Sequence, residues 1–221
     1  MSKFFNQIHG ILESNGESYE SKYPEIKEKN VFSVSTLAHS SASQVYWKLK
    51  GQKGQFPYES HIGKAFFLGR AVHEFIQNRM KDCVSEYPLE YVGAGYKLVG
   101  HIDNISFRDS TVLEYKTTKL HKFTPKKTNA LICDECGIQA MNHNDRSFNS
   151  RLPEYILQAG VYAYIMSKET GRKWNASIFV INGTLTEYEL TQEDINNSWK
   201  VINERAKETY EKLRAMGKIQ I

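Results

Sequence analysis

The sequence has few cysteines and no long apolar run, and these two absences exclude several classes of protein. Three cysteines in 221 residues argue against a disulfide framework. No apolar stretch approaches the roughly 18 residues of a membrane-spanning helix, so we expect no association with a membrane. Residues 1–10 lack a basic segment followed by an apolar one, so we expect no secretion signal. The sequence therefore predicts an intracellular, cytoplasmic protein, in the host cytoplasm if it is viral.

The composition is typical of a folded globular protein. Apolar residues make up 40% of the chain and charged residues 24%, and 221 residues can bury one sizeable core. We expect a single domain over residues 1–221, with residues 1–30 as a polar helical lead-in. Residues 121–150 are irregular and asparagine-rich, which predicts a loop insertion. The net charge of +4 permits a polyanionic partner without requiring one.

The hydrophobic pattern predicts an α/β fold with a central mixed β-sheet flanked by helices. Apolar residues recur at helical spacing over 61–80, 153–171 and 191–216, and Thr191 with Asp194 resembles a capping box at the start of the last helix. Residues 96–107 and 111–118 read as two strands joined by a tight turn at Arg108 and Asp109.

This hairpin predicts a pair of facing carboxylates. With a turn at Arg108–Asp109, Asp103 lies opposite Glu114, with Cβ atoms about 5 Å apart. Lys116 shares the face of Glu114, since side chains alternate along a strand. Two facing carboxylates repel each other, but Mg²⁺ or Mn²⁺ would make the arrangement favourable. The alternative interpretation is a surface pair with Lys116 as its counter-charge.

Four short motifs follow one another along the predicted elements. They are Gly69-x-x-x-His73, Gly100-His101-Ile102-Asp103, Glu114-Tyr115-Lys116 and Gln158-x-x-x-Tyr162. Their order resembles that of the PD-(D/E)XK nuclease superfamily, in its RecB-like exonuclease branch, and is similar to that of CRISPR-associated RecB-like nucleases and small archaeal-virus relatives. The resemblance spans about residues 32–164 and implies a restriction-endonuclease-like core.

The resemblance implies an enzyme: a metal-dependent deoxyribonuclease that hydrolyses phosphodiester bonds. It makes Asp103 and Glu114 the acidic metal ligands and Lys116 the catalytic lysine. His73 would be a further ligand of Mg²⁺ or Mn²⁺, together with the carbonyl of Tyr115. For His73 the alternative is a structural histidine whose hydrogen bonds are satisfied within the fold.

The resemblance also implies residues that contact the substrate, which would be DNA. Gln158 and Tyr162 would contact DNA or support the site, with amphipathic packing as the alternative interpretation. The lysine-rich segment that includes Lys119 and Lys122 reads either as a phosphate-facing rim or as a solvated loop. The rival function is a catalytically silent nucleic-acid-binding or assembly protein on the same fold.

The cysteines depart from the pattern of many RecB-like nucleases. Many of those proteins carry an iron–sulfur cluster held by one early cysteine and three near the C-terminus. Here no cysteine lies in the early segment or after Cys136, so we expect no such cluster. Cys133 and Cys136 form half of a zinc-binding motif that His121 and His143 could complete. Free thiols, a local disulfide or zinc shared between chains remain alternatives, and a homo-oligomer is compatible with the last of these.

Overall fold

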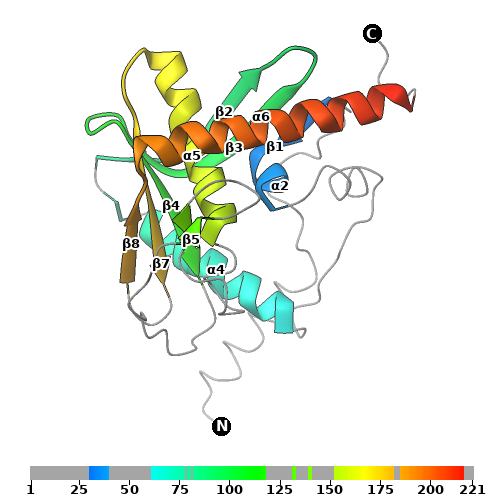
Figure 1. Ribbon diagram of the computed structural model, residues 1–221. Helices are drawn as coiled ribbons and strands as arrows, with labels where there is room; N and C mark the ends of the chain where they lie inside the picture. Colours follow the sequence, from blue (N-terminus) through cyan, green and yellow to red (C-terminus); the bar gives the residue numbers. More distant parts are fainter. Residues whose placement is uncertain are drawn as a thin grey trace, which may run out of the picture.

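The fold is built on a six-stranded mixed sheet, which confirms the predicted α/β class (Figure 1). The computed structural model describes residues 30–39, 61–77, 79–80, 82–117, 131–132, 139–140, 152–181 and 185–216. The strands of the sheet are β1 (Val31–Ser33), β2 (Val84–Val92), β3 (Lys97–Ser106), β4 (Thr111–Thr117), β7 (Asn175–Ile181) and β8 (Leu185–Glu189). Two short strands, β5 (Leu131–Ile132) and β6 (Gln139–Ala140), pair separately.

Strand β3 pairs with three strands. Along one of its edges it pairs antiparallel with β2 over almost its whole length, and its other edge is shared by two strands. On the shared edge, β1 pairs parallel with residues 97–99 and β4 pairs antiparallel with residues 104–106. Among the described residues, this leaves 100–103 of β3 with no ladder partner on that side. The sheet is therefore open at the segment that contains Asp103.

The register of the β3–β4 hairpin agrees with the prediction from its turn. Ser106 pairs with Thr111 and Asn104 with Leu113, around a turn at residues 107–110. The next pair in this register is Asp103 with Glu114. The regular ladder ends one step before it, so both acidic residues lie where the two strands begin to separate.

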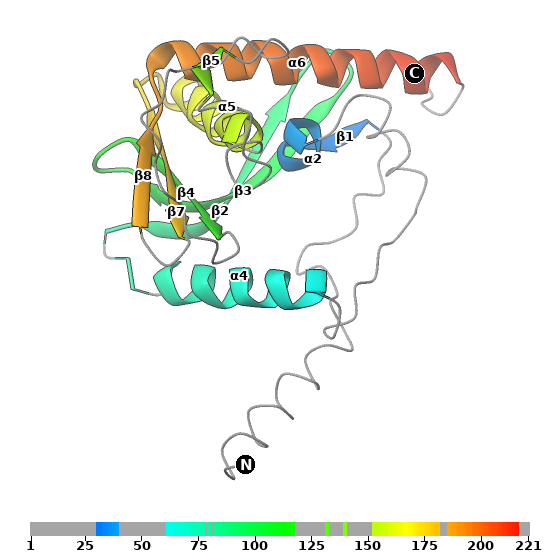
Figure 2. The same cartoon turned by 60° about the horizontal axis from the view of Figure 1, so that its bottom comes forward.

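Helices cover both faces of the sheet. Helix α5 (Leu152–Thr170) lies on one face with α6 (Gln192–Ala215) outside it, and α4 (His61–Gln77) lies on the other (Figure 2). A short helix, α2 (Val34–His39), packs against α5 and α6. None of the described helices is long and apolar enough to cross a membrane.

Local sequence signals account for the placement of α6. Thr191 caps its first turn and forms the predicted capping box with Asp194, whose carboxylate accepts the amide of Thr191 at 2.9 Å. Helices α5 and α6 approach closely at Gly160, where a Cβ would collide with the side chain of Ser198. The small residue therefore sets the distance between the two helices.

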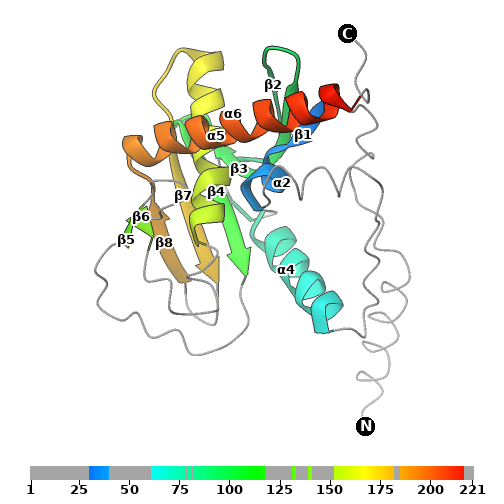
Figure 3. The ribbon, with the colours of Figure 1, turned by 45° about the vertical axis from the view of Figure 1, so that its right-hand side comes forward.

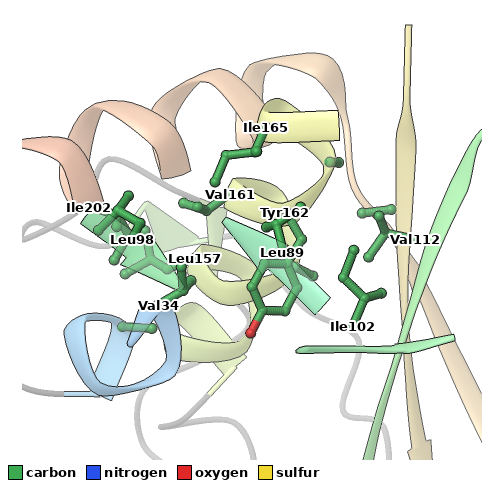
Figure 4. Packing of buried hydrophobic residues seen from close by; sticks show 14 of the residues in the cluster. Val34, Leu89, Leu98, Ile102, Val112, Leu157, Val161, Tyr162, Ile165 and Ile202 are labelled. Atoms are coloured by element: carbon green, nitrogen blue, oxygen red, sulfur yellow. The ribbon is translucent and has the colours of Figure 1, made fainter. Parts of the chain in front are cut away.

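The core lies between α5 and the sheet (Figure 4). Leu98, Ile102 and Val112 from the strands pack near Leu157 and Ile165 from α5, and all five are almost fully buried. Each such aliphatic side chain contributes about 1.5–3 kcal/mol when it leaves water. This packing fixes α5 on the sheet, and with it the polar residues that α5 directs toward β4.

Candidate functional site

Asp103 sits in the opening of the sheet and is tied to the next strand. Its Oδ2 accepts a hydrogen bond from the backbone amide of Tyr115 at 2.8 Å, which replaces a bond that the ladder would have supplied. Its Oδ1 lies 3.5 Å from Nδ1 of His73 on α4. Burial acts to raise the pKa of Asp103, but the contact with His73 and the charge of Lys116 outweigh it and hold the pKa below its ordinary value.

Glu114 is a fully buried carboxylate with one unsatisfied oxygen. Its Oε2 accepts from Lys116 at 2.9 Å and from Gln158 at 3.1 Å, while Oε1 has no hydrogen-bond partner. Burial, followed by the negative charge of Asp103, raises the pKa of Glu114 to about 7. A buried carboxylate oxygen without a donor is costly, so the site is suited to a cation at this position.

Lys116 supplies the positive charge of the site. Its Nζ contacts Glu114 Oε2, lies 3.5 Å from Oε1 of Gln158, and stands 5.3 Å from the ring centroid of Tyr155. Burial acts to lower the pKa of Lys116, but the negative charges of Glu114 and Asp103 outweigh it, so the pKa is raised. The ammonium group therefore stays charged beside the two acids.

Two residues on one face of α5 pack against β3 and β4. Nε2 of Gln158 donates a hydrogen bond to Glu114 Oε2 and lies 3.4 Å from the hydroxyl of Tyr162, one helical turn later. Tyr162 is buried against Gly100, where a Cβ would lie 2.6 Å from its Cε1. Tyr162 therefore packs directly on the segment of β3 that has no ladder partner on this side.

The opposite face of the site is formed by α4. The ring of His73 meets the ring of Tyr115 edge-on at 6.0 Å, because Tyr115 points away from α5 while its neighbours Glu114 and Lys116 point toward it. Gly69, one turn before His73, faces the end of β4: a Cβ there would lie 2.8 Å from the hydroxyl of Thr117. The glycine of the first motif therefore allows α4 to approach β4.

Two residues near the site gave no signal in the sequence. Nε2 of Gln77 donates to the carbonyl of Asp103 at 3.2 Å and to Oε1 of Glu86 at 3.0 Å. Glu86 interrupts the β2–β3 ladder opposite Asp103 and has a φ of 52°, a left-handed conformation that is rare for a non-glycine residue. These contacts fix the backbone of Asp103, and only the tertiary structure reveals them.

The structure brings together the residues of the four predicted motifs but does not describe the other candidates. His73, Asp103, Glu114, Tyr115, Lys116, Gln158 and Tyr162 surround the opening between β3 and β4. Lys119, His121, Cys133, Cys136 and His143 lie outside the described residues. Within the described part of the chain, no three histidine, cysteine, aspartate or glutamate side chains are grouped closely enough to form a metal-ligand set by themselves.

The site combines two carboxylates, which are hard oxygen ligands, with the positively charged ammonium group of Lys116. Two carboxylates, one of them with an unpaired oxygen, are the kind of donor set that Mg²⁺ or Mn²⁺ uses together with water and substrate phosphate. The ammonium of Lys116 can donate hydrogen bonds to an anionic ligand. The site can therefore hold a cation and an anion side by side.

Comparison with known proteins establishes the fold. No family model matches the sequence, and no curated protein matches it. The crystal structure of SSO0001 superposes with a TM-score of 0.53 at 18% identity, over 90% of this chain and 85% of that chain. The two chains share a fold. The crystal structure of a "Putative exonuclease" from Eubacterium rectale matches with a TM-score of 0.42 at 14% identity, over 90% of this chain and 72% of that chain, which is too slight to add to the argument.

Proposed function

We propose that this protein is a metal-dependent deoxyribonuclease of the RecB-like exonuclease branch of the PD-(D/E)XK superfamily. The observation that carries the proposal is the buried carboxylate of Glu114, which lies beside Asp103 and Lys116 and keeps one oxygen without a partner. A cation bound there would satisfy that oxygen and offset the repulsion between the two acids. DNA is proposed as the substrate because the motif order resembles enzymes of that branch.

The residues present fit a divalent cation. Mg²⁺ or Mn²⁺ would be held by Asp103 and Glu114, with water and substrate phosphate as the remaining ligands. His73 and the carbonyl of Tyr115 would become further ligands if the side chains draw in around the ion, because His73, Asp103 and Glu114 are not grouped closely enough to form a ligand set without it. When bound, such an ion supplies an activated water molecule and stabilises charge on the phosphate. The two acids approach from different strands, so a cation would also hold β3 and β4 together at the opening of the sheet.

The side chains around this position have separate roles in the proposed reaction. Lys116 would hold a phosphate oxygen or the attacking water by hydrogen bonding from its charged ammonium group. Gln158 would keep Glu114 oriented by donating to Oε2. Tyr162 would position Gln158 and β3 and would not touch the substrate, because its side chain is buried.

A digest of DNA tests the proposal. Linear single-stranded DNA and circular plasmid are incubated with the protein in Mg²⁺, in Mn²⁺ and in EDTA. Wild-type protein should cut with either metal and should not cut in EDTA. Glu114→Gln should lose activity, while Glu187→Gln, an exposed glutamate on β8, should cut normally. Cutting in EDTA, or full activity of Glu114→Gln, would contradict the assignment.

A further inference from the structure

A histidine–glutamate pair lies at the edge of the candidate site and has no part in the roles described above. Nδ1 of His39, the last residue of α2, is 2.5 Å from Oε2 of Glu154 in the first turn of α5. An ionised carboxylate only accepts hydrogen bonds, so Nδ1 carries the proton of this contact and Nε2 is the other ring nitrogen. The side chains are 31% and 34% exposed, so solvent or a ligand can reach the pair.

The pair is one helical turn from the residues that hold Glu114. Glu154 and Gln158 are four residues apart on α5, which is about 6 Å along the helix axis. The ring of Tyr155 links the two places: His39 meets it edge-on at 5.6 Å, and Nζ of Lys116 lies 5.3 Å from the same centroid. His39 is therefore next to the catalytic lysine of the proposed enzyme, with one aromatic ring between them.

Other contacts already hold α2 in place. Nη1 of Arg205, on α6, donates to the carbonyls of Leu37 and Ala38 at 2.9 and 3.2 Å. Val34, Leu37 and Ala38 are buried against the core, and α2 lies beside the first turns of α5 (Figure 3). A partly exposed ion pair adds little stability to such an anchored element. The geometry of His39 and Glu154 is therefore better explained by what Nε2 can bind.

We propose that His39, oriented by Glu154, binds the phosphate of the DNA strand next to the phosphodiester that is cut. The inference rests on the proposed function and adds a substrate contact to it. With a proton on Nε2, His39 donates to a phosphate oxygen while the Glu154 carboxylate balances the charge of the ring.

Binding of a labelled oligonucleotide tests this role apart from catalysis. Fluorescence anisotropy of fluorescein-labelled single-stranded DNA is measured with the full-length protein in EDTA at several salt concentrations. His39→Ala should weaken binding about tenfold. It should also reduce the slope of log K against log salt by about 0.7, the value for one lost phosphate contact on a single strand. In Mg²⁺, the variant should show a raised KM with kcat nearly unchanged.

Two further variants keep the test decisive. Glu154→Gln retains an acceptor for Nδ1 but loses the charge, so it should show a smaller loss of affinity in the same direction. Lys97→Ala breaks a partly exposed pair with Glu90 on the β2–β3 hairpin and should leave affinity, salt slope and KM unchanged. If His39→Ala lowers Tm but leaves affinity, salt slope and KM as in wild type, the pair only stabilises the fold and the inference is overturned.

The outcomes also separate this inference from the proposed function. If the wild-type protein cuts DNA and Glu114→Gln does not, while His39→Ala binds and cuts as wild type does, only the role of His39 is wrong. If the wild-type protein neither binds nor cuts DNA, the proposed function fails and the role of His39 fails with it.

Discussion

The carboxylate of Asp103 takes the place of a strand partner for Tyr115, whose backbone amide donates to Oδ2 at 2.8 Å. The contact occurs one step beyond the last regular pair of β3 and β4. Because the strands separate there, an acidic side chain can fill the opening instead of pointing into solvent. The negative charge of Asp103 then acts on Glu114, and the properties of the site follow from that proximity.

The stability of the metal-free protein should fall as the pH rises from 4.5 to 7. Folding raises the pKa of Glu114 from 4.5 to about 7, so the unfolded chain releases this proton at lower pH than the folded chain does. The stabilising contribution is complete below pH 4.5 and is lost as the pH passes through 7, a change on the order of 3 kcal/mol. Asp103, whose pKa is lowered, is already ionised in this range.

Urea denaturation in EDTA across this pH range measures the effect. Glu114→Gln is the control, because it cannot ionise and should remove this part of the pH dependence. Saturating Mn²⁺ should also reduce it in the wild type, since a bound cation favours the ionised carboxylate. Identical pH dependence in wild type and Glu114→Gln would show that Glu114 is not perturbed as the structure indicates.

Gln158→Leu should weaken Mn²⁺ binding by about tenfold or more, because residues that orient a metal ligand commonly contribute this much to affinity. Leucine keeps the volume of the side chain but removes the donor to Glu114 Oε2. Isothermal titration calorimetry measures the change. Gln192→Leu, at an exposed position at the start of α6, is the matched control. Equal affinity of Gln158→Leu and wild type would mean that Gln158 only packs.

Lys116→Met should lower Tm more at pH 8 than at pH 5. The substitution keeps the length of the side chain but leaves Glu114 buried without its positive partner, and breaking a buried ion pair costs about 3–5 kcal/mol. At pH 5 the carboxyl group is largely protonated, so most of this cost disappears. Cleavage should fall at least about 100-fold.

Differential scanning calorimetry at both pH values provides the comparison for Lys116→Met. Lys200→Met, at an exposed position on α6, should change Tm little at either pH. If Lys116→Met lowers Tm equally at pH 5 and pH 8, the result would argue against the charge pairing of Lys116 with Glu114.

Much of the site followed from local rules in the sequence. The turn at Arg108–Asp109 fixed the register that places Asp103 with Glu114, and Thr191 with Asp194 predicted the start of α6. The contact between His39 and Glu154 joins residues 115 apart in the chain, and no periodic pattern encodes such a pair.

The burial of individual polar residues also could not be predicted from the sequence. Glu114 lies on a strand with apolar neighbours, but its complete burial depends on Gln158 and on the packing of α5. Tyr162 could be assigned either to DNA or to the support of the site, because helical spacing shows which residues project together and not what covers them. Its place in the gap of β3 is set by tertiary contacts with Gly100.

Gly100→Ala should destabilise the protein by about 1–3 kcal/mol, because the new methyl group would collide with Tyr162. Displacement of Tyr162 should also disturb Gln158 and lower the rate of cleavage. A double-mutant cycle with Tyr162→Leu tests the cause: in that background, Gly100→Ala should cost clearly less. The same cost in both backgrounds would exclude Tyr162 as the source of the constraint.

We expect Asp103 and Glu114 to bind one divalent cation together. Anomalous diffraction from crystals soaked in Mn²⁺ tests it most directly, because the signal locates the ion without reference to activity. We expect an anomalous peak within coordination distance of carboxylate oxygens of both residues, and we expect this peak to be lost in Glu114→Gln crystals. A well-occupied Mn²⁺ bound elsewhere, with no peak between Asp103 and Glu114, would contradict it.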